Sequence, residues 1–229
     1  MPRTLALALC AALAAAAQEA PKSEPVPAPA APPAEVAPAP SPTPTTAPVA
    51  LGPKLDDGLL DPAWFGAGIP FTKGDEVDFY WIKPGLDLAG RTVHMRPWED
   101  PTMLRKGRDG KDNAKATELT DTFPGMLRGA LTGAVHGKVK WSRTEGDLAL
   151  VGRFVDANEG SKAAKWLIGL GAGSETATWD LKILDPKTGE VLLAVHHRAI
   201  SGTAMSTIQD KLVKWSDKFA TFVATRALR

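Results

Sequence analysis

Two adjacent histidines and three alternate glycines are the residues of this chain that most readily suggest chemistry. His196 and His197 are metal-ligand types, but neighbours in a strand point to opposite faces of a sheet, so the two do not easily share one ion. Gly169, Gly171 and Gly173 resemble a phosphate-binding loop. A dinucleotide fingerprint, however, needs a strand before its glycines and a helix after them, and here a predicted strand follows the glycines.

The remaining candidates for catalysis are weaker. Ser174 lacks the following glycine that a nucleophile elbow needs. His94 and His136 have no carboxylate partner close by in the sequence that would mark a site. We therefore predict a protein that is not an enzyme and that holds no cofactor and no metal. The alternative is an enzyme with a dispersed active site, built by the fold from His94, His197 and nearby carboxylates.

Residues 160–173, with the sequence GSKAAKWLIGLGAG, form the strongest candidate for a contact surface. They belong to a link of about 18 residues between two predicted strands, whereas hairpin loops usually have two to five residues. A short apolar run lies between lysines and glycines, which suits docking on a partner or peripheral contact with a membrane. The predicted partner-binding residues are Ser161, Lys162, Lys165, Trp166, Leu167, Ile168, Gly169, Gly171 and Gly173. The alternative is a lid in which Trp166 and Leu167 close one end of the sheet core.

Five strands are predicted to position this segment, at residues 77–83, 91–98, 147–156, 176–184 and 191–198. The strand at 147–156 is apolar on both sides, so we expect it to be central. The strand at 176–184 alternates more regularly. This alternation predicts that one face of the strand is directed to the core and that the other is exposed to water and carries Thr176, Thr178, Asp180 and Lys182.

Two helices complete the predicted domain. Apolar residues recur at helical spacing from Leu119 to Ala134, after a polar loop at residues 99–113. An N-cap at Thr120 or Asp121 would place Pro124 in the first turn, where proline is tolerated. A capping box from Ser206 to Gln209 predicts the start of the last helix. The element order predicts an α+β fold: a two-layer sandwich with a mostly antiparallel sheet of about five strands and two helices on one face.

The N-terminal third of the 229 residues points to export. Residues 1–17 read as a signal peptide, with one basic residue, an apolar run and a small-residue cleavage site. Residues 18–50 are a disordered linker rich in proline and alanine, residues 51–75 an irregular aromatic lead-in, and residues 76–229 a single domain. The single cysteine, Cys10, lies in the signal, where the preceding Leu9 disfavours lipid attachment; whether the N-terminus is cleaved, retained or lipidated stays open.

The charge of the chain narrows the choice of partners. Its 27 basic and 26 acidic residues leave a net charge of +1, so there is no long-range field that would attract nucleic acid. We therefore expect no nucleic-acid partner.

Several segments resemble a bacterial domain-of-unknown-function family of exported envelope proteins and lipoproteins. They are Gly-Ser-Lys-Ala-Ala-Lys at 160–165, Gly-Leu-Gly-Ala-Gly at 169–173 and the strand end Asp-Pro-Lys-Thr-Gly-Glu at 185–190. The resemblance covers about residues 80–225, with Lys165 in place of the usual arginine. It implies an α+β fold and a periplasmic or other envelope location, and it implies no activity.

Together, these patterns predict a non-catalytic, exported cell-envelope protein that binds an envelope protein or cell-wall component. A subunit of an oligomeric envelope or secretion assembly is a further alternative, alongside the enzyme with a dispersed site.

Overall fold

The structure is a computed structural model that describes residues 58–66, 68–161, 173–202 and 206–229. The chain divides into two units, Met1–Pro44 and Thr45–Arg229, and every described residue belongs to the second. The predicted signal peptide and the proline-rich linker lie outside the described residues.

One mixed sheet of seven strands forms the centre of the second unit, in the order β1-β2-β7-β6-β5-β3-β4. Neighbouring strands are antiparallel from β1 to β5, and β3 runs parallel to both β5 and β4. The strands are β1 (Thr72–Lys73), β2 (Phe79–Ile82), β3 (Thr92–Met95), β4 (Lys140–Ser142), β5 (Leu148–Asn158), β6 (Thr176–Leu184) and β7 (Val191–Ile200). The predicted α+β class is confirmed, whereas the predicted number of five strands is wrong. The two additional strands, β1 and β4, have two and three residues, too few for a recognisable alternation.

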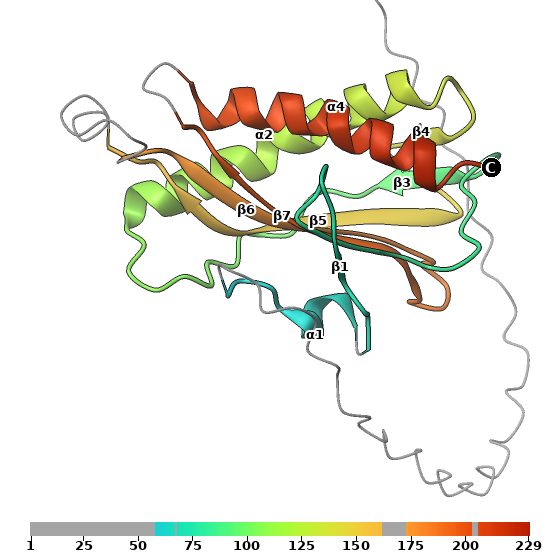
Figure 1. Cartoon of the computed structure of the whole chain (residues 1–229), viewed down its shortest axis with the longest axis horizontal. Helices are drawn as coiled ribbons and strands as arrows, with labels where there is room; N and C mark the ends of the chain where they lie inside the picture. The colour runs from blue at the N-terminus through green and yellow to red at the C-terminus, as the bar shows by residue number, and fades with distance from the viewer. Residues whose placement is uncertain (1–57, 67, 162–172, 203–205) are drawn as a thin grey trace, which may run out of the picture. The chain divides into compact units, whose positions relative to one another are not determined.

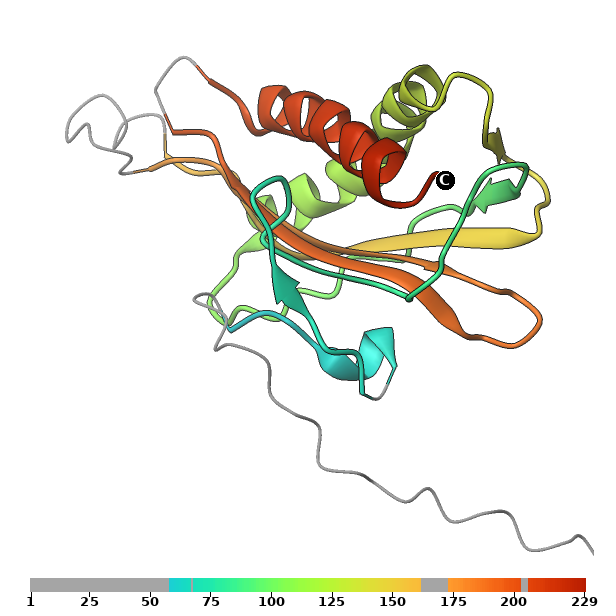
Figure 2. The ribbon, with the colours of Figure 1, turned by 45° about the vertical axis from the view of Figure 1, so that its right-hand side comes forward.

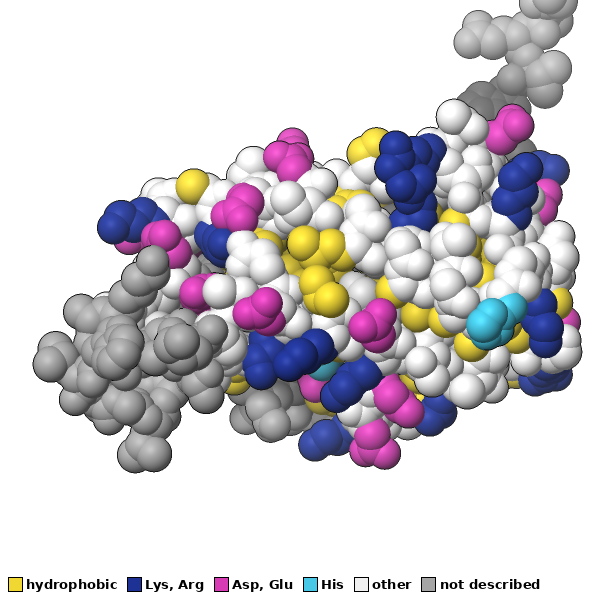
Figure 3. Space-filling model, turned by 90° about the horizontal axis from the view of Figure 1, so that it is seen from above, with side chains coloured by type: hydrophobic (Ala, Val, Ile, Leu, Met, Phe, Trp, Pro, Cys, Tyr) yellow, Lys and Arg dark blue, Asp and Glu magenta, His cyan; other side chains and the backbone are white. Residues whose placement is uncertain are grey.

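Helices α2 (Gly110–Ala134) and α4 (Ile208–Arg226) lie together on one face of the sheet (Figure 1). The four-residue helix α1 (Pro62–Phe65) lies on the opposite face, as a second view also shows (Figure 2). The view onto the α2–α4 layer shows acidic and basic side chains scattered over this face, with hydrophobic side chains among them (Figure 3).

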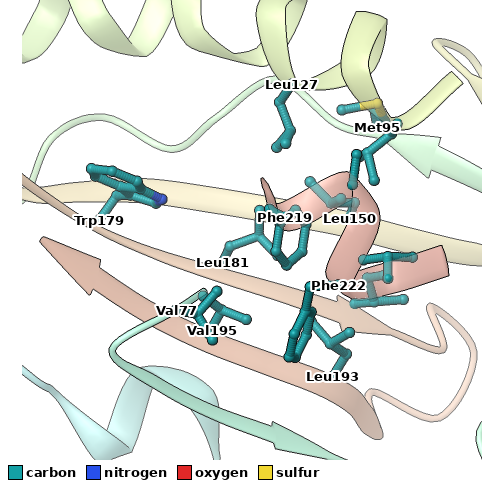
Figure 4. Close-up of a cluster of buried hydrophobic side chains, with 14 of the residues drawn as sticks. Val77, Met95, Leu127, Leu150, Trp179, Leu181, Leu193, Val195, Phe219 and Phe222 are labelled. Atoms are coloured by element: carbon teal, nitrogen blue, oxygen red, sulfur yellow. The ribbon is translucent and has the colours of Figure 1, made fainter. Parts of the chain in front are cut away.

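The main core fills the space between the sheet and the two long helices (Figure 4). Trp179 of β6 is fully buried there and meets Trp215 of α4 edge-on, with 4.9 Å between the ring centroids. Phe123 of α2 packs on Trp179 at 5.3 Å, so the core joins both helices to the central strands. Burying aromatic side chains of this size stabilises the fold by several kcal/mol in total, at about 1.5–3 kcal/mol for each large apolar side chain.

Helix α2 begins earlier than the sequence predicted, at Gly110 rather than after Thr120. Asp109 caps it: its side chain accepts hydrogen bonds from the backbone N–H groups of Lys111 and Asp112, at 2.8 and 3.0 Å. Pro124 therefore lies in the helix interior and not in the first turn. The predicted loop at 99–113 is correspondingly shorter, because its last residues form the first turn of α2.

The last helix has its capping box one residue later than predicted. Thr207 is the N-cap of α4 and pairs with Asp210, in place of the predicted pair Ser206 and Gln209. The side chain of Asp210 accepts from the backbone N–H of Thr207 at 3.0 Å and from the hydroxyl of Thr207 at 2.9 Å. These two hydrogen bonds hold the pKa of Asp210 below its ordinary value.

The predicted water-exposed face of β6 is wrong for three of its four residues. Thr176, Thr178 and Asp180 are buried, and only Lys182 is half-buried. Residues of the aromatic lead-in cover this face: Phe65 and Phe71 form a second apolar cluster with Ala194 of β7. The period-two pattern identified which side chains share a face, but it carried no information about what packs on that face.

Candidate functional site

The base of the predicted contact segment is a tight junction between the ends of β5 and β6. The backbone N–H of Ser161 donates to the carbonyl of Gly173 at 2.9 Å. Gly160 has φ +73°, and a Cβ built there would lie 2.4 Å from the same carbonyl oxygen. Both the backbone conformation and the close approach require glycine at this position.

Two of the nine predicted contact residues, Ser161 and Gly173, are therefore brought together at this junction. The other seven lie outside the described residues, namely Lys162, Lys165, Trp166, Leu167, Ile168, Gly169 and Gly171.

Glu175 fastens the junction to β7 and α4. Its backbone N–H donates to the hydroxyl of Ser201 at 3.0 Å, and its carbonyl accepts from the N–H of Ser201 at 2.9 Å. Its carboxylate accepts from the N–H of Ile208, the first residue of α4, at 2.8 Å. A helix N-terminus presents N–H groups without partners in the helix, and a carboxylate there is stabilised by the helix dipole.

Asp112 fastens the junction to α2 in a similar way. One oxygen of its carboxylate accepts from the backbone N–H of Glu159, just after β5, at 3.0 Å. Asp112 also belongs to the capping box of α2 with Asp109. Hydrogen bonds from the N–H groups of Asp112 and Lys111 hold the pKa of Asp109 below its ordinary value. The ends of β5 and β6 are thus attached to the N-termini of both long helices.

A polar hollow of about 550 Å³ lies beside this junction. Lys111 and Lys115 line it from α2, and Ser161, Glu175 and Gln209 line it from the strand ends and α4. The amide of Gln209 donates to Glu118 at 2.7 Å, and Lys115 forms an ion pair with the same carboxylate at 2.9 Å. The hydrogen bond from Lys115 lowers the pKa of Glu118. The lining offers both cationic and anionic groups next to the contact segment, which suits recognition of a polar partner surface.

A separate polar network lies under the lead-in, on the second face of the sheet. Arg153 of β5 donates to Asp180 of β6 through Nε at 3.0 Å and through Nη2 at 2.9 Å. The Nδ1 of His196 lies 2.7 Å from the other oxygen of Asp180. Because a carboxylate only accepts hydrogen bonds, this nitrogen carries the proton. Arg153 also reaches Asp61, the N-cap of α1, at 3.1 Å, so the network fixes α1 on the sheet.

A second buried carboxylate, Asp156, binds the segment before α2. Arg108 donates to both of its oxygens, at 2.6 and 2.7 Å, and Arg105 lies 3.3 Å away. The hydrogen bonds that Arg108 donates to Asp156 raise the pKa of Arg108 above its ordinary value. Basic residues of the predicted polar loop are thus used to neutralise a buried carboxylate.

The two adjacent histidines lie on opposite faces of β7, as predicted. His196 contacts Asp180 under the lead-in, and His197 stacks on Trp215 in the main core, with ring centroids 5.2 Å apart. His94 lies on β3, which β6 and β5 separate from β7 in the sheet, so the structure does not bring His94 and His197 together. In the described ranges, no group of three or more histidine, cysteine or acidic side chains is arranged to hold a metal ion.

Glu175 and Asp112 are the residues of this region that sequence reasoning missed. The spacing Asp109–Asp112, three residues apart before an apolar stripe, is a capping signature and would have identified one of them. The reach of Glu175 to the start of α4 spans 33 residues, and no local pattern records it.

No helix among the described residues is long and apolar enough to cross a bilayer.

Several solved structures resemble this chain at about 10% sequence identity. A PelC dodecamer from Paraburkholderia phytofirmans aligns with a TM-score of 0.42 and 10% identity, over 66% of this chain and 96% of that chain. A DUF330 protein from Xanthomonas campestris gives a TM-score of 0.39 at 11% identity, over 63% and 90% of the two chains. A putative lipoprotein from Caulobacter crescentus gives 0.27 at 12% identity, over 58% and 86%.

The search among curated proteins found no match to this chain. A family model does match, over residues 100–211, and its description is a domain of unknown function, DUF4410. The matched region runs from the segment before α2 to the first turn of α4, so it includes the junction and the contact segment described above.

Proposed function

We propose that this chain is a non-catalytic, exported protein of the cell envelope that binds another envelope component through residues 160–173. The observation that carries the proposal is the junction of Ser161 and Gly173. It holds the two ends of the segment 2.9 Å apart and ties them to α2, β7 and α4. A binding segment displayed from a rigid base loses less conformational freedom on binding than one displayed from a flexible base.

The composition of the segment supports the same proposal. Trp166, Leu167 and Ile168 follow two lysines, and tryptophan is the residue type most enriched among energetically dominant interface residues. The polar hollow beside the junction would supply the hydrogen-bonding rim that surrounds such an apolar anchor.

Site-specific crosslinking tests this function. A photoreactive amino acid at position 164, in the full chain exported to a bacterial envelope, is expected to give one dominant crosslinked product in the envelope fraction. The double variant Trp166→Ala plus Ile168→Ser, with the crosslinker at the same position, is expected to lose that product.

The matched control is the pair Lys187→Ala and Thr188→Ala, in the β6–β7 turn at the opposite end of the sheet. These two exposed residues should leave the crosslinked product unchanged. Equal yields from the wild type and the Trp166 and Ile168 variant would discard the binding segment, and recovery of the chain in the cytosol alone would discard export.

A further inference from the structure

A second hollow, distinct from the junction, lies between the middle of α2 and the end of β3. It has a volume of about 350 Å³. Arg96, Arg128 and Arg143 line it, together with a single acidic residue, Asp121. Three positive charges against one negative charge leave two positive charges in excess. We call this feature the arginine groove.

The three arginines differ from most other arginines of the fold, because no carboxylate of the described residues lies within ion-pair distance of their guanidinium groups. Arg91, Arg105, Arg108, Arg153 and Arg226 each have a carboxylate within 4.0 Å. Among the described residues, no hydrogen bond or ion pair engages the guanidinium groups of Arg96, Arg128 and Arg143. Three like charges that face a single opposite charge repel one another, so an anion in the groove would relieve that repulsion.

Each arginine is attached to a separate, well-fixed element. The backbone N–H of Arg96 donates to the carbonyl of Leu150 in β5 at 3.1 Å, which extends β3 along the sheet. Arg128 lies within α2. The carbonyl of Arg143 is 3.0 Å from the Nε2 of His94, which ties the turn after β4 to β3. The geometry of the groove is therefore set by the fold.

The apolar residues that line the groove indicate what kind of group would lie beside the anion. Met95 is 7% exposed and forms an apolar wall together with Pro97 and Pro124. Gly125 adds no side chain, and a Cβ built there would meet no atom within 4 Å. The volume lies at the lower end of the range of small-molecule sites, about 300–1,000 Å³. The groove thus offers a cationic part and an apolar part of limited size.

We propose that the arginine groove binds a phosphate monoester whose phosphate is attached to an apolar group. Guanidinium groups match phosphate oxygens with two parallel hydrogen bonds, which ammonium groups do not provide. The excess of two positive charges matches the charge of a phosphate monoester, about −1.5 to −2 at neutral pH. The apolar wall accommodates the group next to the ester oxygen. This site does not depend on the segment at 160–173.

Isothermal titration calorimetry of the full chain with phenyl phosphate tests the proposal. We expect saturable binding that weakens about tenfold for each of Arg96→Gln, Arg128→Gln and Arg143→Gln, since each removes charge-assisted hydrogen bonds. Asp121→Asn should tighten binding a few-fold, because it removes the one repulsive carboxylate. Lys187→Gln, which removes an equal charge from the distant turn, is the matched control and should change nothing.

A second arm separates the two sources of this chemistry, a soluble ester and a lipid headgroup. Vesicles of phosphatidylcholine with and without phosphatidic acid are tested for co-sedimentation with the chain. Binding of phenyl phosphate alone supports a soluble ester, whereas binding that requires phosphatidic acid supports a headgroup. Either result must be lost in the triple arginine variant. Absence of binding in both arms, or binding that survives the triple substitution in a variant with unchanged circular dichroism, overturns the proposal.

Discussion

Replacing the buried carboxylate of Asp180 should destabilise the domain more than any exposed change of the same type. The carboxylate is fully buried and accepts two hydrogen bonds from Arg153 and one from His196. In Asp180→Asn, the Arg153 guanidinium, only 6% exposed, keeps one ion pair within the described part of the chain, with Asp61 at 3.1 Å. Breaking a buried ion pair costs about 3–5 kcal/mol. The remaining contact with Asp61, which is 34% exposed, favours the lower end, about 3 kcal/mol.

Urea denaturation measures this loss directly. With a denaturant slope of about 2 kcal/mol per molar urea, a loss of about 3 kcal/mol lowers the unfolding midpoint by about 1.5 M. Asp217→Asn, the same change on the exposed side of α4, should stay within about 0.5 kcal/mol of wild type.

The double variant Arg153→Met plus Asp180→Leu adds a sharper test. It removes both charges, so it should be more stable than Asp180→Asn although it carries one more substitution. A loss below about 1 kcal/mol for Asp180→Asn, or a double variant less stable than the single one, would refute the reasoning that an uncompensated guanidinium dominates the cost.

Two further predictions concern a helix glycine and a titrating carboxylate. Gly129→Ala should stabilise the domain by about 1 kcal/mol, because Gly129 lies within α2 and an added Cβ meets no atom within 4 Å. Gly152→Ala should instead destabilise the domain, because the added Cβ would lie 2.4 Å from the Trp98 ring. Burial alone would raise the pKa of Asp78, but hydrogen bonds and charge interactions, led by those of His197, outweigh burial and hold the pKa below 3.8. The stability contributed by this carboxylate is therefore complete above pH 3.8 and is lost as the pH falls through the lower folded-state value.

Thermal unfolding of the glycine variants and an NMR titration of Asp78 are the matching measurements. His197→Ala should move the pKa of Asp78 upward and reduce the loss of stability in acid. An Asp78 pKa at or above 3.8 in the wild type would contradict the assignment, as would a destabilised Gly129→Ala variant.

Strongly periodic segments of the sequence were sufficient to predict the central strands. The alternation from Thr176 to Leu184 gave the bounds of β6, and the core positions Trp179, Leu181 and Ile183 are all fully buried. The apolar period of a strand shows which of its side chains share a face. It therefore predicts burial correctly on the face of β6 that packs against the apolar stripes of the helices.

The second face of β6 shows where such reasoning fails. Asp180 looked like a residue in contact with water because its charge is compatible with solvent. Its partner Arg153 is 27 residues away, and Asp61, the other partner of Arg153, is 92 residues from that arginine, so only the fold brings the three together. The predicted start of α2 was wrong for a different reason. The first turn of α2 is polar and shows no apolar stripe, and Pro124 suggested a start near Thr120, whereas the helix is capped by Asp109.

The arginine groove was equally inaccessible to sequence reasoning. Arg128 lies in α2, and Arg96 and Arg143 directly follow β3 and β4, so each alone resembles an ordinary surface charge. The contact segment shows the opposite situation. Its composition was sufficient to predict a contact surface, and the structure adds the junction at Ser161 and Gly173, which a glycine pattern alone does not indicate.

The short strands at the two margins of the sheet restrict how another molecule could join this fold. β1 offers two residues and β4 three, so a polypeptide laid alongside either would gain only a few main-chain hydrogen bonds. Recognition by extending the sheet is therefore disfavoured for the part of the chain that the structure describes. Specificity would then depend on side chains, and selection could change the ligand by point substitution while the backbone stays the same.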